Sequence, residues 1–101
     1  MAFTKVAEVK DVPPGKGRQV NVKGKTIALF NCGGTFYAID DSCCHRGAPL
    51  WEGDLEGSVV TCPWHGAQFD VTTGAVLAPP APEPVKTYPL HIDQGNLVVE
   101  V

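Results

Sequence analysis

Features that would place a chain in a membrane or on nucleic acid are missing from this sequence. No stretch is apolar over the roughly 20 residues that a membrane-spanning helix needs, and the N-terminal residues lack the apolar run of a signal peptide. The 8 basic residues are outnumbered by 11 acidic ones, which leaves no excess of positive charge for nucleic acid. We therefore expect a cytoplasmic protein whose partners are neither membranes nor nucleic acids.

Helical periodicity is also missing, because no window of helical length repeats its apolar residues about every 3.6 positions. The 11 glycines and 9 prolines indicate many turns. A chain of 101 residues is the size of one small domain. The sequence predicts a single all-β domain, residues 1–101, with antiparallel sheets. Its strand-forming runs lie at 3–10, 18–22, 26–30, 35–39, 58–62, 68–71, 85–93 and 97–101.

Cysteine and histidine are scarce, and most of them gather in two short pairs. The first pair is Cys43 and His45; after sixteen intervening residues, Cys62 and His65 form the second. Two thiolates and two imidazoles suit an iron or zinc centre, and cytoplasmic cysteines more often bind metal than form disulfides. A zinc finger usually takes both cysteines from one pair and both histidines from the other. Mixed pairs favour a centre of two irons in which each loop touches both, and a zinc site is the alternative.

The two Cys–His pairs, with the proline-rich segment 78–84 downstream, resemble the Rieske 2Fe–2S family, in which two histidines replace two cysteines on one iron. The resemblance implies that Cys43 and Cys62 hold the inner iron. It also implies that His45 and His65 hold the outer iron, near the surface. All four residues would then be ligands of a Rieske-type 2Fe–2S cluster.

The same resemblance implies a fold of stacked antiparallel sheets with a cluster-binding subdomain formed by hairpin loops. That subdomain would span about residues 40–66, and segment 78–84 would cover the cluster with rigid backbone that has few N–H donors. Gly47 and Gly66 follow the two histidines. Glycine at these positions either brings backbone N–H groups towards the cluster sulfurs or simply turns the chain.

Four positions differ from the Rieske proteins of the respiratory cytochrome complexes. That branch has an extra cysteine in each loop, forming a disulfide, and serine and tyrosine hydroxyls beside the second loop. The corresponding residues here are Ala48 and Trp64 in the first case, and Ala67 and Phe69 in the second. Without hydroxyl donors the cluster keeps more electron density and its potential falls. The chain is therefore similar to the low-potential, soluble Rieske-type ferredoxins that serve oxygenases.

The resemblance implies a one-electron carrier that transfers electrons from a reductase to a terminal oxygenase of the ring-hydroxylating dioxygenase type. Such a protein is not itself an enzyme, and we expect it to act as a monomer. An alternative is the small Rieske-like subunit of a nitrite reductase, held in a stable complex. A third is the Rieske domain of an oxygenase catalytic chain, which would need a further iron-binding domain after Val101.

The remaining chemistry-bearing residues receive plainer interpretations. Cys32, beside Gly33 and Gly34, is expected to be a turn residue with no role, and Cys44 a free thiol. His91 is expected to be a strand or surface histidine. A group of acidic residues lies close to the first pair, and we expect them either to be solvated or to steer a partner by charge. These are Asp40, Asp41, Glu52, Asp54 and Glu56.

Overall fold

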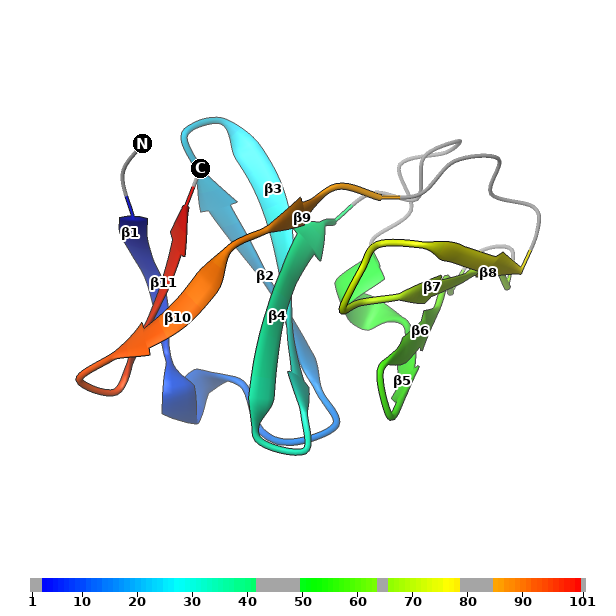
Figure 1. Cartoon of the computed structure of the whole chain (residues 1–101), viewed down its shortest axis with the longest axis horizontal. Coiled ribbons are helices and arrows are strands. Elements are labelled where there is room, and N and C mark those ends of the chain that lie inside the picture. The colour runs from blue at the N-terminus through cyan, green and yellow to red at the C-terminus, as the bar shows by residue number, and fades with distance from the viewer. Residues whose placement is uncertain (1–2, 42–49, 64–65, 79–84, 101) are drawn as a thin grey trace.

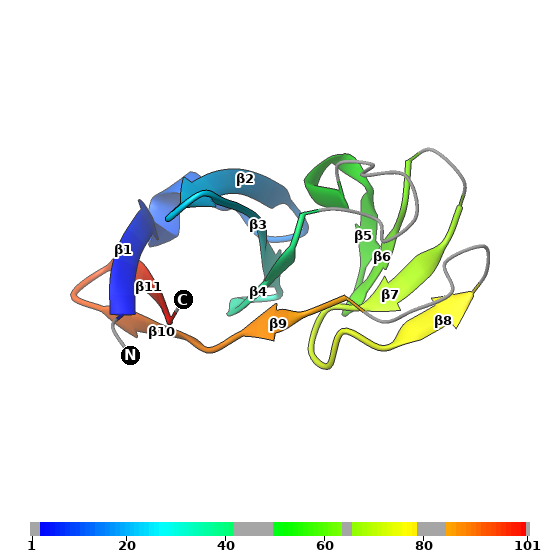
Figure 2. The ribbon, with the colours of Figure 1, turned by 90° about the horizontal axis from the view of Figure 1, so that it is seen from above.

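The computed structural model describes residues 3–41, 50–63, 66–78 and 85–100, and its strands form three antiparallel sheets (Figures 1 and 2). The first sheet has the order β1 (Phe3–Glu8), β11 (Asn96–Glu100), β10 (Leu90–Asp93). The second has the order β2 (Gly17–Val22), β3 (Lys25–Cys32), β4 (Thr35–Asp40), β9 (Thr87–Tyr88). The third has the order β5 (Asp54–Glu56), β6 (Val59–Thr61), β7 (Gln68–Asp70), β8 (Val76–Ala78). The all-β antiparallel prediction is confirmed.

The second sheet lies between the other two and is covered on both faces (Figure 2). Successive side chains of a strand point to opposite faces, so the apolar run in β3 divides between two cores. Ile27 and Leu29 pack into the core shared with the first sheet, whereas Ala28 and Phe30 pack into the core shared with the third. All four are fully buried. Because β3 is buried on both faces of the sheet, its residues 27–30 are all apolar instead of alternating between apolar and polar.

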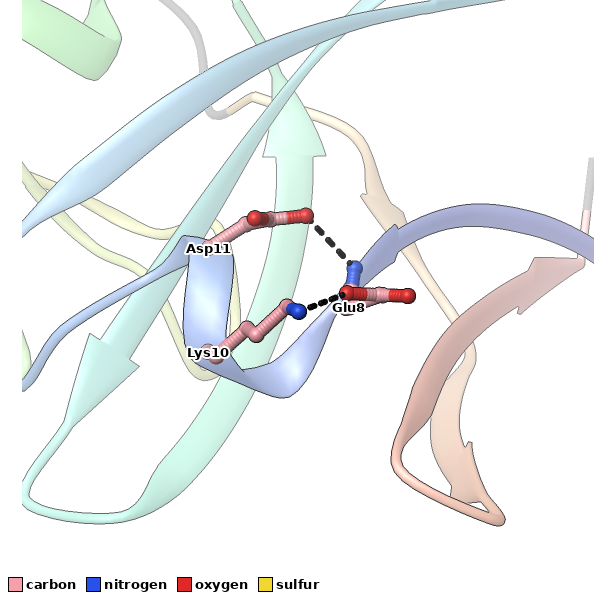
Figure 3. Close-up of polar contacts among 3 residues, drawn as sticks. All are labelled: Glu8, Lys10 and Asp11. Atoms are coloured by element: carbon pink, nitrogen blue, oxygen red, sulfur yellow. Dashed lines mark hydrogen bonds and ion pairs between the residues drawn. The ribbon is translucent and has the colours of Figure 1, made fainter.

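Two short 3-10 helices link the sheets: η1 (Val9–Asp11) and η2 (Leu50–Glu52). The predicted strand 3–10 ends earlier, at Glu8, because η1 begins at Val9 (Figure 3). The backbone N–H of Glu8 donates to the Asp11 carboxylate at 3.0 Å, which ties the start of η1 to its end. The exposed Lys10–Glu8 ion pair at 3.1 Å adds little to stability.

The predicted strand 85–93 is wrong as a single strand. Pro89 separates β9, which pairs with β4 in the second sheet, from β10, which pairs with β11 in the first. Proline has no N–H to donate and fixes its own φ, so it interrupts a ladder and lets the chain change sheets.

The third sheet is built from short consecutive strands inserted between β4 and β9 (Figure 1). Two of them, β5 and β8, were missed by the sequence interpretation. In β5 a single apolar residue lies between two acids, and β8 runs directly into the proline-rich segment. The sheet also continues past residue 66, where the predicted subdomain ended, as far as Ala78.

Candidate metal centre

The second Cys–His pair begins at the tip of the β6–β7 hairpin. Thr61 pairs with Gln68 at the last rung of the ladder, and Cys62 follows directly. The N–H of Cys62 donates to the carbonyl of Ala67 at 2.7 Å, and the N–H of Gly66 donates to the carbonyl of Cys62 at 3.1 Å. The prediction that this loop is the tip of a hairpin is confirmed for the residues that flank 64–65.

Gly66 has a φ of +76°, a conformation that glycine adopts at little cost. Because its N–H already has the Cys62 carbonyl as acceptor, the interpretation of Gly66 as a turn glycine is the better one. The structure gives no support to the idea that this N–H is aimed at a cluster sulfur. Gly47, the other glycine of that prediction, lies outside the described residues.

The Cys62 side chain is 2% exposed and belongs to the core between the second and third sheets. Its neighbours in that core include Ala67 and Phe69, both fully buried. The described residues fit a thiolate ligand on the inner side of a cluster, because they form a dry apolar wall behind the sulfur and bring no competing acid. As alanine and phenylalanine, residues 67 and 69 bring no hydroxyl to this core.

The chain on either side of segment 42–49 is fixed by one buried carboxylate. Asp41 is 2% exposed, and it accepts hydrogen bonds from the Gln19 amide nitrogen at 2.6 Å and the Trp51 backbone N–H at 2.8 Å. Burial raises the pKa of the Asp41 carboxyl, and the two donors offset part of that rise while Glu52 adds to it. The interpretation of Asp41 as a solvated or steering acid is therefore wrong.

The other acids of that group divide into two kinds. Asp40 is half-buried and accepts a hydrogen bond from the Tyr88 hydroxyl at 2.5 Å, so it too has a structural partner. Burial, with a further contribution from Asp40, raises the pKa of Tyr88 well above its usual value. Glu52, Asp54 and Glu56 are exposed, as expected. They line an open hollow of about 630 Å³ between η2, β5 and the residues before β2.

Of the predicted ligands, the structure describes Cys62 alone; Cys43, His45 and His65 lie outside the described residues, as does Cys44. Within the described part of the chain, no three His, Cys, Asp or Glu side chains come together as a metal site.

Cys32 and His91, which the sequence interpretation left out of the metal site, both lie among the described residues. Cys32 is the last residue of β3 and pairs with Thr35, so its interpretation as a turn residue is wrong. It is half-buried against the same core as Cys62, and burial, followed by the Asp70 charge, raises the pKa of its thiol. A raised pKa keeps the thiol protonated and unreactive. His91 is exposed on β10, with its ring centroid 4.4 Å from that of Phe3, so its prediction as a surface histidine is confirmed.

Comparisons with known proteins agree on one family. The family described as Rieske [2Fe-2S] domain matches residues 2–89. The chain is 43% identical over 101 residues to the biphenyl dioxygenase ferredoxin subunit of Pseudomonas sp. (strain KKS102), with 99% of this chain and 93% of that protein covered. The solved ferredoxin of Sphingomonas yanoikuyae B1 matches with a TM-score of 0.93 and 32% identity, with 99% of both chains covered. A chain in the complex of reduced oxygenase and oxidised ferredoxin of carbazole 1,9a-dioxygenase matches with a TM-score of 0.90 and 37% identity, with 96% and 91% covered.

The chain therefore belongs to the Rieske [2Fe-2S] family. Within that family it is a Rieske-type ferredoxin, and its cofactor is a Rieske-type 2Fe–2S cluster. The resemblance stated from the two Cys–His pairs is confirmed, and the alternative of a zinc site is not supported. In the part of the chain that the structure describes, no helix has the length and apolar character to cross a membrane.

Proposed function

We propose that this protein carries single electrons from a reductase to a terminal oxygenase of the ring-hydroxylating type. The observation that carries the proposal is the near full-length match to a dioxygenase ferredoxin subunit, together with the match to a chain from a solved oxygenase–ferredoxin complex. The protein acts as an electron-transfer component and leaves the oxidation of substrate to its partner. The small subunit of a nitrite reductase is the weaker candidate, because these relatives are named as dioxygenase ferredoxins.

The proposed ligands are Cys43 and Cys62 on the inner iron, and His45 and His65 on the outer iron. When bound, the cluster supplies one reversible electron at a potential tuned by its surroundings. Cys62 suits the inner position because its side chain faces a core that excludes water.

Residues 42–85, between β4 and β9, form the proposed cluster-binding subdomain. This insert contains nearly all of the predicted segment of about 40–66, the proline-rich segment 78–84, and also the strands β7 and β8. The first and second sheets serve as the base that holds the insert.

Charge is distributed unequally between the insert and the base. Residues 42–85 carry five acidic residues and a single basic one, Arg46, although the whole chain has a net charge of only −3. The rest of the chain holds seven of the eight basic residues. We propose that the insert approaches partners through a basic patch on their surface, since complementary fields accelerate encounter.

The ligand assignment is tested on purified holoprotein. Wild type should contain two irons and two acid-labile sulfides, and its reduced form should give an electron-spin resonance signal with an average g below that of all-cysteine clusters. His45→Ala and His65→Ala should each abolish the signal, while His91→Ala, the matched control on the surface of β10, should retain it. One zinc per chain without sulfide would overturn the assignment.

The role as a free carrier is tested separately. The protein should elute as a monomer and should fractionate with the cytoplasm, and catalytic amounts should restore electron flow between a purified reductase and its ring-hydroxylating oxygenase. Co-purification in a fixed complex with nitrite reductase, with no oxygenase activity restored, would favour the alternative.

A further inference from the structure

Asp41 is the last described residue before segment 42–49, and Leu50 is the first after it. The Asp41 backbone belongs to the base, because its N–H donates to the Thr26 carbonyl at 3.1 Å. Its carboxylate reaches in two directions: one oxygen accepts from Gln19 on β2, and the other accepts from the N–H of Trp51 in η2. A single side chain therefore joins the base to both ends of this segment.

The helix η2 is itself tightly held, so the far end of this connection does not move freely. Leu50 is fully buried, and the N–H of Gly53 donates to its carbonyl at 2.9 Å. Gly17 on β2 leaves room for the Trp51 carbonyl, because a Cβ on Gly17 would lie 2.7 Å from that oxygen. Trp51 is consequently placed by β2 on its carbonyl side and by Asp41 on its amide side.

A buried carboxylate is a costly way to stabilise a fold, since an apolar side chain of similar size often does as well. Its advantage is geometric. The two oxygens accept strong hydrogen bonds from two separate elements and fix the distance between them. Asp41 has this arrangement, because each of its two carboxylate oxygens accepts a hydrogen bond with a donor–acceptor distance below 2.9 Å.

We propose that Asp41 is a positioning residue for the cluster: by joining residue 41, Gln19 and Trp51, its carboxylate holds both ends of the segment that contains Cys43 and His45. The proposal rests on the ligand roles proposed above. A positioning residue differs from one that merely adds stability. By fixing the two ends of the segment, Asp41 should affect the ligand geometry and the rate at which the cluster is lost.

The test compares Asp41→Ala with a control of similar stability. Val99→Ala is the control, since Val99 is fully buried in the other core, between the first and second sheets. Both holoproteins are studied under conditions that leave equal fractions unfolded. Asp41→Ala should lose its visible cluster absorbance to an iron chelator roughly 10- to 100-fold faster than Val99→Ala, because hydrogen bonds to a buried charge are lost. Its reduced spin-resonance signal should also broaden, whereas that of Val99→Ala should not.

A conservative variant sharpens the result. Asp41→Asn keeps one carbonyl oxygen for the Trp51 N–H, and the Gln19 amide can turn to accept from the new NH₂ group. It should therefore recover most of the wild-type retention and line width. Equal cluster loss in Asp41→Ala and Val99→Ala, or an unchanged spectrum in Asp41→Ala, would overturn the positioning role.

Failure of the proposal and failure of the ligand assignment give different results. If wild type holds the cluster, His45→Ala abolishes it and Asp41→Ala leaves retention and spectrum unchanged, the positioning role alone is wrong. If wild type holds no iron and sulfide, the ligand assignment fails and the positioning role falls with it.

Hydrogen exchange at the Trp51 amide should accelerate in Asp41→Ala but not in Val99→Ala, which verifies the contact independently.

Discussion

The two loops that contain the proposed ligands are closed by different means. The loop after β6 returns directly into β7, and its own backbone closes it through the Cys62–Ala67 and Gly66–Cys62 hydrogen bonds. The segment after β4 connects the end of the second sheet to η2, so its ends lie on separate elements and a side chain, Asp41, joins them. A hairpin tip needs only a suitable turn residue, whereas a crossing between sheets needs a specific buried contact.

The largest effect should come from removing Cys62, the proposed ligand at the hairpin tip. Cys62→Ser should eliminate bound iron and sulfide, because a hydroxyl is a poor ligand for a soft iron site. Cys32→Ser is the matched control, since Cys32 packs against the same core from β3 and should leave the metal content unchanged. Metal analysis and the visible spectrum provide the measurement, and equal loss in the two variants would contradict the assignment.

The crossing loop can be disturbed through Gly17→Ala. The added Cβ would lie 2.7 Å from the Trp51 carbonyl oxygen and 2.8 Å from a ring carbon of Phe30, so β2 and η2 must separate. We expect a loss of about 1–3 kcal/mol in the free energy of unfolding, as for other overpacked sites. Urea denaturation measures it. An unchanged midpoint would show that η2 is less firmly seated on β2 than the structure indicates.

The hairpin tip can be disturbed through Gly66→Ala, where the cause is different. A Cβ at this position meets no atom of the described residues within 4 Å, but its φ of +76° strains an L-residue. The expected loss in the free energy of unfolding is about 1–2 kcal/mol. Gly66→Asn should recover part of it, because asparagine tolerates left-handed backbone better than alanine. Equal effects of Ala and Asn would argue against strain as the cause.

The surroundings of the hairpin loop should also set the potential. With alanine at 67 and phenylalanine at 69, we expect a midpoint near the lower end of the Rieske range, about −150 to +300 mV, and independent of pH around neutrality. Voltammetry between about pH 6 and 10 measures both properties. A midpoint that already falls near pH 6.5, about where an ordinary histidine titrates, would contradict the independence of pH. Ala67→Ser with Phe69→Tyr should raise the midpoint, while Phe36→Tyr, in the other core, should not. A midpoint well above zero would refute the low-potential interpretation.

The smallest effect concerns the exposed acids that follow the crossing loop. Asp54→Lys with Glu56→Lys should slow association with a partner and weaken its dependence on salt, because exposed charges act over about 8 Å at physiological ionic strength. Asp93→Lys, compared with Asp54→Lys alone, makes the same charge change on β10, at the opposite end of the molecule from β5 (Figure 1). Electron-transfer rates against salt concentration measure the effect. Equal slowing by the control would leave no role for this particular surface.

Much of this comparison could be predicted from the sequence, because ligand spacing and turn residues are local signals. The two Cys–His pairs, the all-β class and the hairpin after residue 58 needed only neighbouring residues. The role of Asp41 could not be predicted, because its partners are Gln19 and Trp51, 22 and 10 residues away. A run of acids in a sequence suggests solvent, and only the packing of η2 on β2 reveals that one of them is buried.

The order of the strands along the chain has a consequence for synthesis on the ribosome. The third sheet uses only residues 54–78 and pairs each strand with the next, so its pairing is complete before β9, β10 and β11 are made. The base must wait, because β11 pairs with β1 and β9 pairs with β4. Pairing of neighbouring strands is fast, and pairing across most of the chain is slow. We expect the nascent chain to pass through a stage in which the third sheet has formed while the base is still open.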